Sequence, residues 1–150
     1  MEKRGIDISR YQGKPDFSKV KNDVDYVILQ AGYGRYVSQI DTEFERGYSE
    51  CKKYGIPVGA YWFSYAKTTA EALAEANACI EIIKGKQFEY PIYYDLEIGL
   101  DKLGKSLVSS IATTFCNALE KAGYYTGITF PALLHSCISL KKLHRDTLCG

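Results

Sequence analysis

Short apolar runs alternate with helical patterns along the whole chain. The runs at residues 5–9, 26–31, 58–63, 91–96 and 124–129 predict five strands. Between them lie segments of helical character at residues 16–21, 42–55, 68–85 and 103–123, and a further helix is expected near Pro131. Strands that alternate with helices predict an α/β fold with parallel strands and right-handed crossovers.

Capping signals support the helices of this pattern. Asp41 or Thr42 can cap the second of these helices, and Thr42 with Glu45 and Thr68 with Glu71 have the spacing of a capping box. Glycines at the ends of three of these segments match the usual residue after a helix, and these are Gly55, Gly85 and Gly123. Helical spacing predicts two buried stripes, which are Leu73-Ala76-Ile80-Ile83 and Leu103-Leu107-Ile111-Phe115-Leu119.

Two architectures fit parallel strands: an open doubly wound sheet and a barrel. A phosphate-binding loop of the first would need more glycines than Gly32-Tyr33-Gly34-Arg35 offers, and a helix directly after it. A barrel places its site at the carboxyl ends of its strands. Asp7, Asp95 and Glu97 lie there, which favours a TIM-barrel-like β/α barrel of about five parallel strands.

The strongest chemical signal is the segment YPIYYDLE at residues 90–97. Side chains alternate along a strand, so Asp95 and Glu97 are expected on the same side. Two neighbouring carboxyl groups hinder each other's ionisation, and glycoside hydrolases use such pairs. Two residues along a strand separate Cβ atoms by about 6.5 Å. That separation lies between the distances typical of retaining and inverting pairs, so the stereochemical outcome stays open.

Composition and charge reduce the number of function classes that fit the chain. The 150 residues carry a net charge of +1, which favours a single domain over residues 1–150 and gives no case for nucleic acid or an anionic membrane. No apolar run reaches the length of a membrane span, and the N-terminus lacks a signal peptide. The five cysteines have no metal-ligand spacing, and Cys51, Cys79 and Cys116 are expected in the core. His135 and His144 are expected at the surface.

Five motifs in register carry a resemblance to a known family. They are GIDISRYQG at 5–13, QAGYG at 30–34, GAYWFSY at 59–65, YYDLE at 93–97 and AGYYTG at 122–127. In order and spacing they resemble the glycoside hydrolase family 25 lysozymes, the Chalaropsis-type muramidases. The resemblance extends from residue 5 to about residue 145.

The resemblance implies an irregular β/α barrel that cleaves the β-1,4 bond between N-acetylmuramic acid and N-acetylglucosamine in bacterial peptidoglycan. It implies Glu97 as general acid, and Asp95 as the group that orients or stabilises the reacting sugar, including attack by the substrate's own N-acetyl group. Asp7 would line the same cleft. The residues implied to contact sugar or line the cleft are Tyr33, Tyr61, Phe63 and Tyr65. No cofactor or metal is implied, and action on the wall after secretion or phage delivery is expected.

The chain also departs from the family. Relatives normally continue with further strands, so we expect a C-terminally truncated domain whose activity is impaired. An incomplete barrel exposes strand edges, which a second copy of the chain could cover. Two other functions stay open at this point: a non-catalytic peptidoglycan-binding module on the same scaffold, and an unrelated α/β domain whose acids bind a divalent cation.

Overall fold

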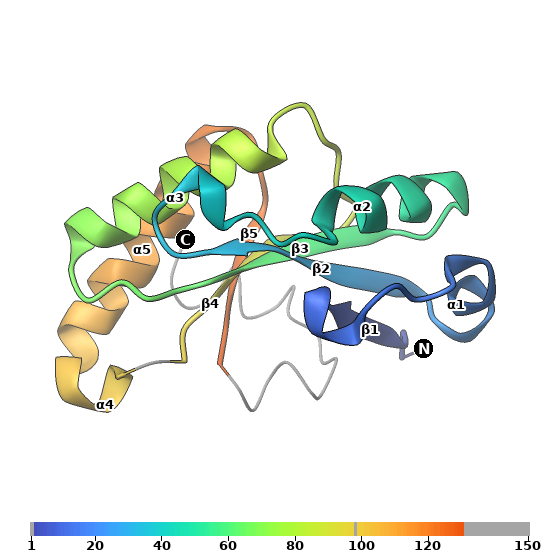
Figure 1. The fold of residues 1–150 in the computed structure, drawn as a ribbon. Helices are drawn as coiled ribbons and strands as arrows, with labels where there is room; N and C mark the ends of the chain where they lie inside the picture. The colour runs from blue at the N-terminus through green and yellow to red at the C-terminus, as the bar shows by residue number, and fades with distance from the viewer. Residues whose placement is uncertain (1, 98, 131–150) are drawn as a thin grey trace.

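The computed structural model describes residues 2–97 and 99–130, and its centre is one parallel sheet (Figure 1). The strands are β1 (Gly5–Ile8), β2 (Tyr26–Tyr33), β3 (Val58–Phe63), β4 (Ile92–Asp95) and β5 (Thr126–Thr129). Their spatial order is β1-β2-β3-β4-β5, so every strand lies beside its neighbour in sequence. A sequential order is that of a β/α barrel, whereas a doubly wound sheet reverses direction at a switch point.

Helices connect the strands. They are α1 (Phe17–Asp23), α2 (Phe44–Lys53), α3 (Thr69–Ile83), α4 (Leu100–Leu103) and α5 (Lys105–Lys121), with the 3₁₀ turns η1 (Arg10–Gln12) and η2 (Val37–Gln39). Within the described residues β1 pairs only with β2 and β5 only with β4, so the sheet does not close. The prediction of an incomplete β/α barrel is therefore confirmed.

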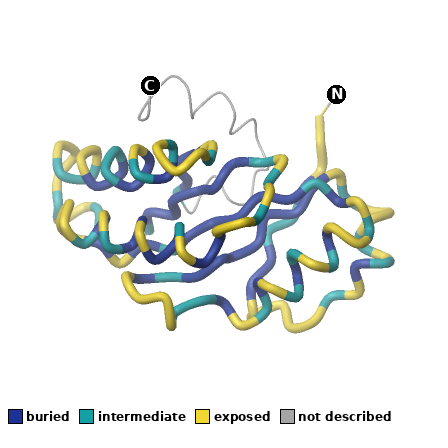
Figure 2. The backbone as a smooth tube through the Cα atoms, turned by 90° about the horizontal axis from the view of Figure 1, so that it is seen from above, coloured by how far each residue is buried: buried dark blue, intermediate teal, exposed yellow. Residues whose placement is uncertain are grey.

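The main core lies between the sheet and the helices α2, α3 and α5. It contains the helix-facing residues of every strand and the apolar stripes of the helices, and Figure 2 shows the buried face of each helix turned toward the buried strands. Trp62 and Phe115 are fully buried there. Cys51, Cys79 and Cys116 are buried in the same core, as predicted.

The opposite face of the sheet carries a smaller cluster of rings. Tyr26, Tyr61 and Tyr93 pack there around Ile28. Glycines on neighbouring strands make room for these rings: a Cβ on Gly5 would lie 2.1 Å from Tyr26 Cε2. A glycine on one strand thus leaves space for a ring that projects from the neighbouring strand.

Three predicted elements differ in detail from the structure. β2 does not end at Ala31 but continues through an irregularity between Gln30 and Gly32 to Tyr33. The long helix predicted from Leu103 is divided, because Gly104 has a positive φ of 82° between α4 and α5. Leu73 is 46% exposed, since the buried stripe of α3 runs instead through Ala72, Glu75, Ala76, Ala78, Cys79, Ile82 and Ile83.

One predicted cap is wrong and another is confirmed. α2 begins after Glu43 without a side-chain cap, because the side chain of Asp41 accepts the Glu43 N–H instead. Thr68 does cap α3, and its Oγ1 accepts the Glu71 N–H at 3.1 Å. The expected helix near Pro131, His135 and His144 lie outside the described residues. No helix in the described part of the chain is long and apolar enough to cross a membrane.

Candidate active site

The register of the sheet places the predicted site residues on the face opposite the helices. Phe63 pairs with Asp95, and Tyr61 pairs with both Gln30 and Tyr93. Asp7, on the edge strand β1, pairs with Ile28 on β2. Because paired residues share a face, Asp7, Tyr61, Phe63 and Asp95 all lie on the face opposite the helices, which we call the cleft side after the cleft expected from the sequence.

Asp95 and Glu97 follow one another on that side. β4 ends at Asp95, yet Leu96 still donates its N–H to the Thr129 carbonyl at 2.9 Å and is buried in the helix-side core. The alternation therefore persists one residue beyond the strand. The charge of Glu97 raises the pKa of Asp95, so the two carboxyl groups lie close to each other, as the alternation along the strand predicts.

Burial controls the charge of this pair. Asp95 is 1% exposed, and burial raises its pKa from 3.8 to about 8. The charge of Glu97, the hydrogen bond with Glu97 and the charge of Asp7 all act in the same direction. Asp95 Oδ1 has no hydrogen-bond partner within the described residues. Asp95 therefore keeps a proton at neutral pH beside Glu97, and general acid catalysis requires such a proton.

Tyr61 lies beside the carboxyl groups at the floor of the cleft. Its hydroxyl is 3.5 Å from Gln30 Oε1, and the residue is only 8% exposed. Burial raises the pKa of Tyr61, and the charges of Asp7, Asp95 and Asp41 raise it further. Tyr61 thus lies beside the acids, as predicted. Its side chain is buried, so it offers little surface for contact with a sugar.

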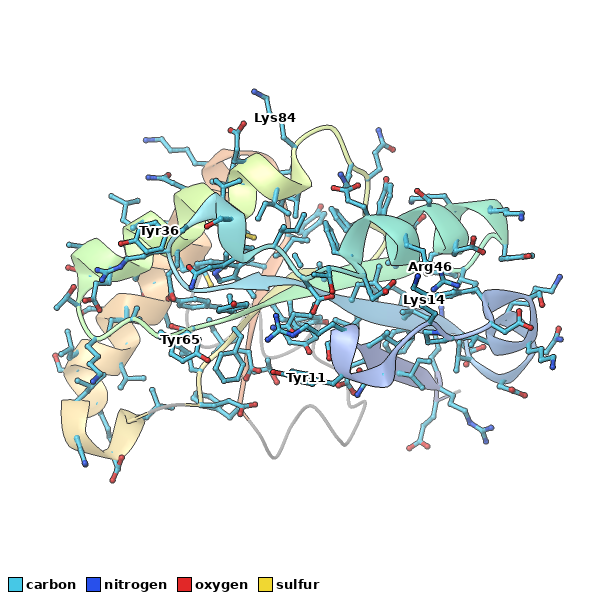
Figure 3. All side chains as sticks on the ribbon, viewed as in Figure 1. Tyr11, Lys14, Tyr36, Arg46, Tyr65 and Lys84 are labelled. Carbon is cyan, nitrogen blue, oxygen red and sulfur yellow. The ribbon has the colours of Figure 1, made fainter. Side chains whose placement is uncertain are left out.

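The other predicted aromatic residues form a continuous edge. Tyr33 and Tyr65 meet edge to face with ring centroids 6.0 Å apart, and Phe63 lies 5.2 Å from Tyr65. Tyr65 is 51% exposed and projects on the side of the sheet away from α2 and α3 (Figure 3). Exposed aromatic rings at strand ends suit contact with the apolar faces of sugars.

Glu75, on α3, was missed from the sequence. It is 1% exposed and accepts hydrogen bonds from Ser64 Oγ at 2.8 Å, from Tyr65 N at 2.8 Å and from the Tyr94 hydroxyl. Ser64 N in turn donates to the Asp95 carbonyl at 3.0 Å. Glu75 therefore ties the carboxyl ends of β3 and β4 together behind the cleft. Its place on the helix face of Ala72, Ala76 and Cys79 was the available signal.

Asp41 joins two segments of the chain, a role beyond the helix cap that the sequence predicts. It is 2% exposed, and its Oδ2 accepts the Arg10 N–H at 3.0 Å while Oδ1 accepts the Glu43 N–H at 2.9 Å. The first bond fixes η1, the turn directly after β1, against the segment that leads into α2. The long-range partner explains why local sequence spacing did not reveal this role.

The acids do not form a metal site. Within residues 2–97 and 99–130, no three histidine, cysteine or acidic side chains are placed to hold one ion. The arrangement of Asp7, Asp95 and Glu97 therefore gives no support to the divalent-cation alternative. The same arrangement accounts for the raised pKa of Asp95.

A comparison with protein families gives one match. The model described as glycosyl hydrolases family 25 matches residues 6–142. No curated protein sequence matches the chain at a significant level.

Solved structures resemble the chain over most of its length. The modular autolysin LytC from Streptococcus pneumoniae is 31% identical with a TM-score of 0.75, over 91% of this chain and 34% of that chain. The same autolysin in complex with a synthetic peptidoglycan ligand is 30% identical with a TM-score of 0.75 over the same shares of 91% and 34%. A family GH25 lysozyme from Aspergillus fumigatus, at 24% identity and a TM-score of 0.69, shares the fold over 85% of this chain and 65% of that chain. The chain thus spans about a third of the length of the autolysin.

Proposed function

This chain belongs to glycosyl hydrolases family 25, and from that membership we propose that it hydrolyses the β-1,4 bond between N-acetylmuramic acid and N-acetylglucosamine in bacterial peptidoglycan. The observation that carries the proposal is the buried Asp95 close to Glu97, where Asp95 keeps a proton at neutral pH. The similarity to an autolysin studied with a peptidoglycan ligand adds support.

In the proposed mechanism Glu97 is the general acid. Asp95 is 1% exposed whereas Glu97 is partly exposed, so Glu97 is the member of the pair that a glycosidic oxygen can reach. The proton of Asp95 passes through Glu97 to that oxygen as the bond to the sugar carbon breaks. Asp95 is left as an anion beside the sugar that gains positive charge, which it stabilises directly or by orienting the N-acetyl group. A water molecule then adds to the sugar carbon and returns a proton to Glu97.

The remaining predicted residues have supporting roles in this proposal. Asp7 contributes to the negative potential that keeps the proton on the pair, as its effect on the pKa of Asp95 indicates. Tyr61 restricts the floor of the cleft. Tyr33, Phe63 and Tyr65 provide the aromatic edge on which sugar rings pack.

Release of reducing ends from purified cell walls tests the proposal. We expect Glu97→Gln to lower the rate by about 10²–10⁴-fold, because it removes the general acid. Glu81→Gln is the matched control, since Glu81 is exposed on α3. Wild-type activity should fall as pH rises through about 8, where Asp95 loses its proton. Wall binding by the wild type without release of reducing ends would contradict the enzymatic proposal.

The site of action and the assembly belong to the same proposal. We propose action at the cell wall, after secretion or phage delivery. We also propose that a second copy of the chain covers strand edges, since within the described residues β1 and β5 each pair on one side only. Sedimentation at high protein concentration tests the second point, and a monomer under those conditions would contradict it.

A further inference from the structure

Charges of opposite sign are separated at the mouth of the cleft. The acids Asp7, Asp95 and Glu97 occupy its centre, as their mutual effect on the pKa of Asp95 indicates. Two exposed arginines lie at its edge: Arg10 in η1, directly after β1, and Arg35 in the loop directly after β2. We define the arginine rim as Arg10, Tyr11, Tyr33, Arg35, Tyr36 and Tyr65.

Arg10 is held in place although it is exposed. Its guanidinium carbon lies 5.0 Å from the ring centroid of Tyr11 and 5.4 Å from that of Tyr33. Its Nη2 donates to the Tyr11 hydroxyl at 3.1 Å, and its backbone N–H donates to the buried Asp41. No acid of the described residues forms an ion pair with Arg10. Its positive charge is therefore preorganised and available to a ligand.

Arg35 projects from an equally fixed loop. Trp62 Nε1 donates to the Gly34 carbonyl at 2.8 Å, and Gly34 has a positive φ of 69° that favours glycine. The guanidinium meets Glu71 at 3.5 Å and stays 51% exposed. The other carboxylate oxygen of Glu71 accepts a hydrogen bond from the Lys67 N–H at 2.7 Å.

A cavity connects this loop to the aromatic edge. It has a volume of about 240 Å³ and is lined by Gly34, Arg35, Tyr36, Gln39, Tyr65, Ala66, Glu71 and Glu75. Tyr65 contacts Tyr33, and Tyr33 in turn lies beside Arg10, so the two arginines belong to one continuous rim. Lys84 lies at the other end of α3, directly after its last residue, whereas Glu71 belongs to the first turn of that helix.

The chemistry of this rim fits an extended, acidic ligand with amide groups. Guanidinium groups pair with carboxylates, and tyrosine rings pack on flat amides and short apolar side chains. The substrate of the proposed function combines two parts: a neutral glycan backbone and a peptide that muramic acid carries through its lactyl group, with free carboxylates. The three central acids repel such carboxylates, and positive charges at the rim offset that repulsion.

We propose that the arginine rim binds the acidic peptide arm of the glycan, an inference that rests on the proposed function. The cleft then accepts the neutral sugars over its acids while the rim selects chains that carry peptides. The wall also contains acidic phosphate polymers, so the test uses glycan freed of these. Peptide-bearing glycan is compared with the same glycan after amidase has removed the peptide.

Equilibrium binding to Glu97→Gln, which cannot consume the ligand, is the first measurement. We expect this protein to bind peptide-bearing glycan more tightly than bare glycan. Arg10→Gln and Arg35→Gln, each added to Glu97→Gln, should reduce that preference about three- to tenfold. Lys84→Gln, which removes an exposed charge away from the rim, should leave the preference unchanged. Equal binding of both glycans, or an unaltered preference in both arginine variants, would overturn the inference.

Cleavage by the otherwise wild-type chain is the second measurement. The arginine variants should raise KM for the peptide-bearing glycan and change kcat much less, because the rim lies outside the carboxyl pair. A common loss of kcat on both glycans would mean a structural effect and overturn the inference. If the wild type cleaves neither glycan, the proposed function fails, while the binding measurement still decides whether the rim recognises the peptide.

Discussion

Glu75 and Asp95 are buried carboxyl groups on opposite faces of the sheet, and their surroundings contrast. Glu75, on the helix side, accepts hydrogen bonds from Ser64, Tyr65 and Tyr94. Burial raises the pKa of Glu75, and these hydrogen bonds offset only part of that rise. Asp95, on the cleft side, has an oxygen without a hydrogen-bond partner within the described residues, and every influence on its pKa raises it.

The contrast shows that burial alone does not create a catalytic acid. A buried carboxyl surrounded by donors acts as an anchor, because the donors stabilise its ionised form and fix its position. A buried carboxyl surrounded by other acids retains a proton that it can pass on. Glu75 holds the strand ends in place from behind, and this lets Asp95 remain poorly satisfied in front without disturbing the sheet.

The largest effect is expected from removing the anchor. Glu75→Leu removes the acceptor of the Tyr65 N–H and of the Ser64 and Tyr94 hydroxyls, which keep only their bond to each other. This should lower the free energy of unfolding by about 3–5 kcal/mol. Urea unfolding measures the loss. Glu81→Leu on the exposed face of the same helix is the control, with an expected change within about 0.5 kcal/mol. A loss for Glu75→Leu as small as that of the control would remove the distinction between anchor and surface acid.

Removing the carboxyl group of Asp95 is expected to raise the free energy of unfolding instead of lowering it. Asp95→Asn should raise the free energy of unfolding by about 1–2 kcal/mol at pH 9 and abolish wall cleavage. Because the pKa of Asp95 rises from 3.8 to about 8 on folding, the unfolded chain loses this proton first, and wild-type stability falls between those pH values. The gain should therefore be absent below pH 4, grow with pH and level off above pH 8. A gain that is the same at pH 3 and pH 9 would show that the proton is not its cause.

The smallest effect is expected from removing a single donor to the anchor. Tyr94→Phe keeps the ring stacked on Phe115 at 3.8 Å but deletes the hydroxyl that donates to Glu75, at a cost of about 1 kcal/mol. Thermal unfolding of Tyr94→Phe, Glu75→Leu and the double variant forms a cycle. In the Glu75→Leu background the loss of the hydroxyl should no longer destabilise the protein. Fully additive losses would contradict the hydrogen bond as the cause.

The sequence predicted the strands and the cleft acids because both depend on short-range alternation. Asp95 and Glu97 share a side for the same reason that Leu96 faces the core. The predicted cap at Thr42 is wrong because the neighbouring Asp41 accepts the Glu43 N–H, and the second bond of Asp41, from the Arg10 N–H, involves a partner far away in sequence. Glu75 escaped notice because a helix containing a glutamate normally exposes it, and only the packing of α3 against the ends of β3 and β4 places three donors around it.

The sequential order of the strands has a consequence for how the protein is made. Each strand hydrogen-bonds to the strand that precedes it in the chain, so a segment leaving the ribosome meets a partner that is already present. No strand of the described sheet has to be inserted between two others. The sheet can thus grow from β1 to β5 during synthesis, and the carboxyl pair forms its surroundings only when β4 docks on β3.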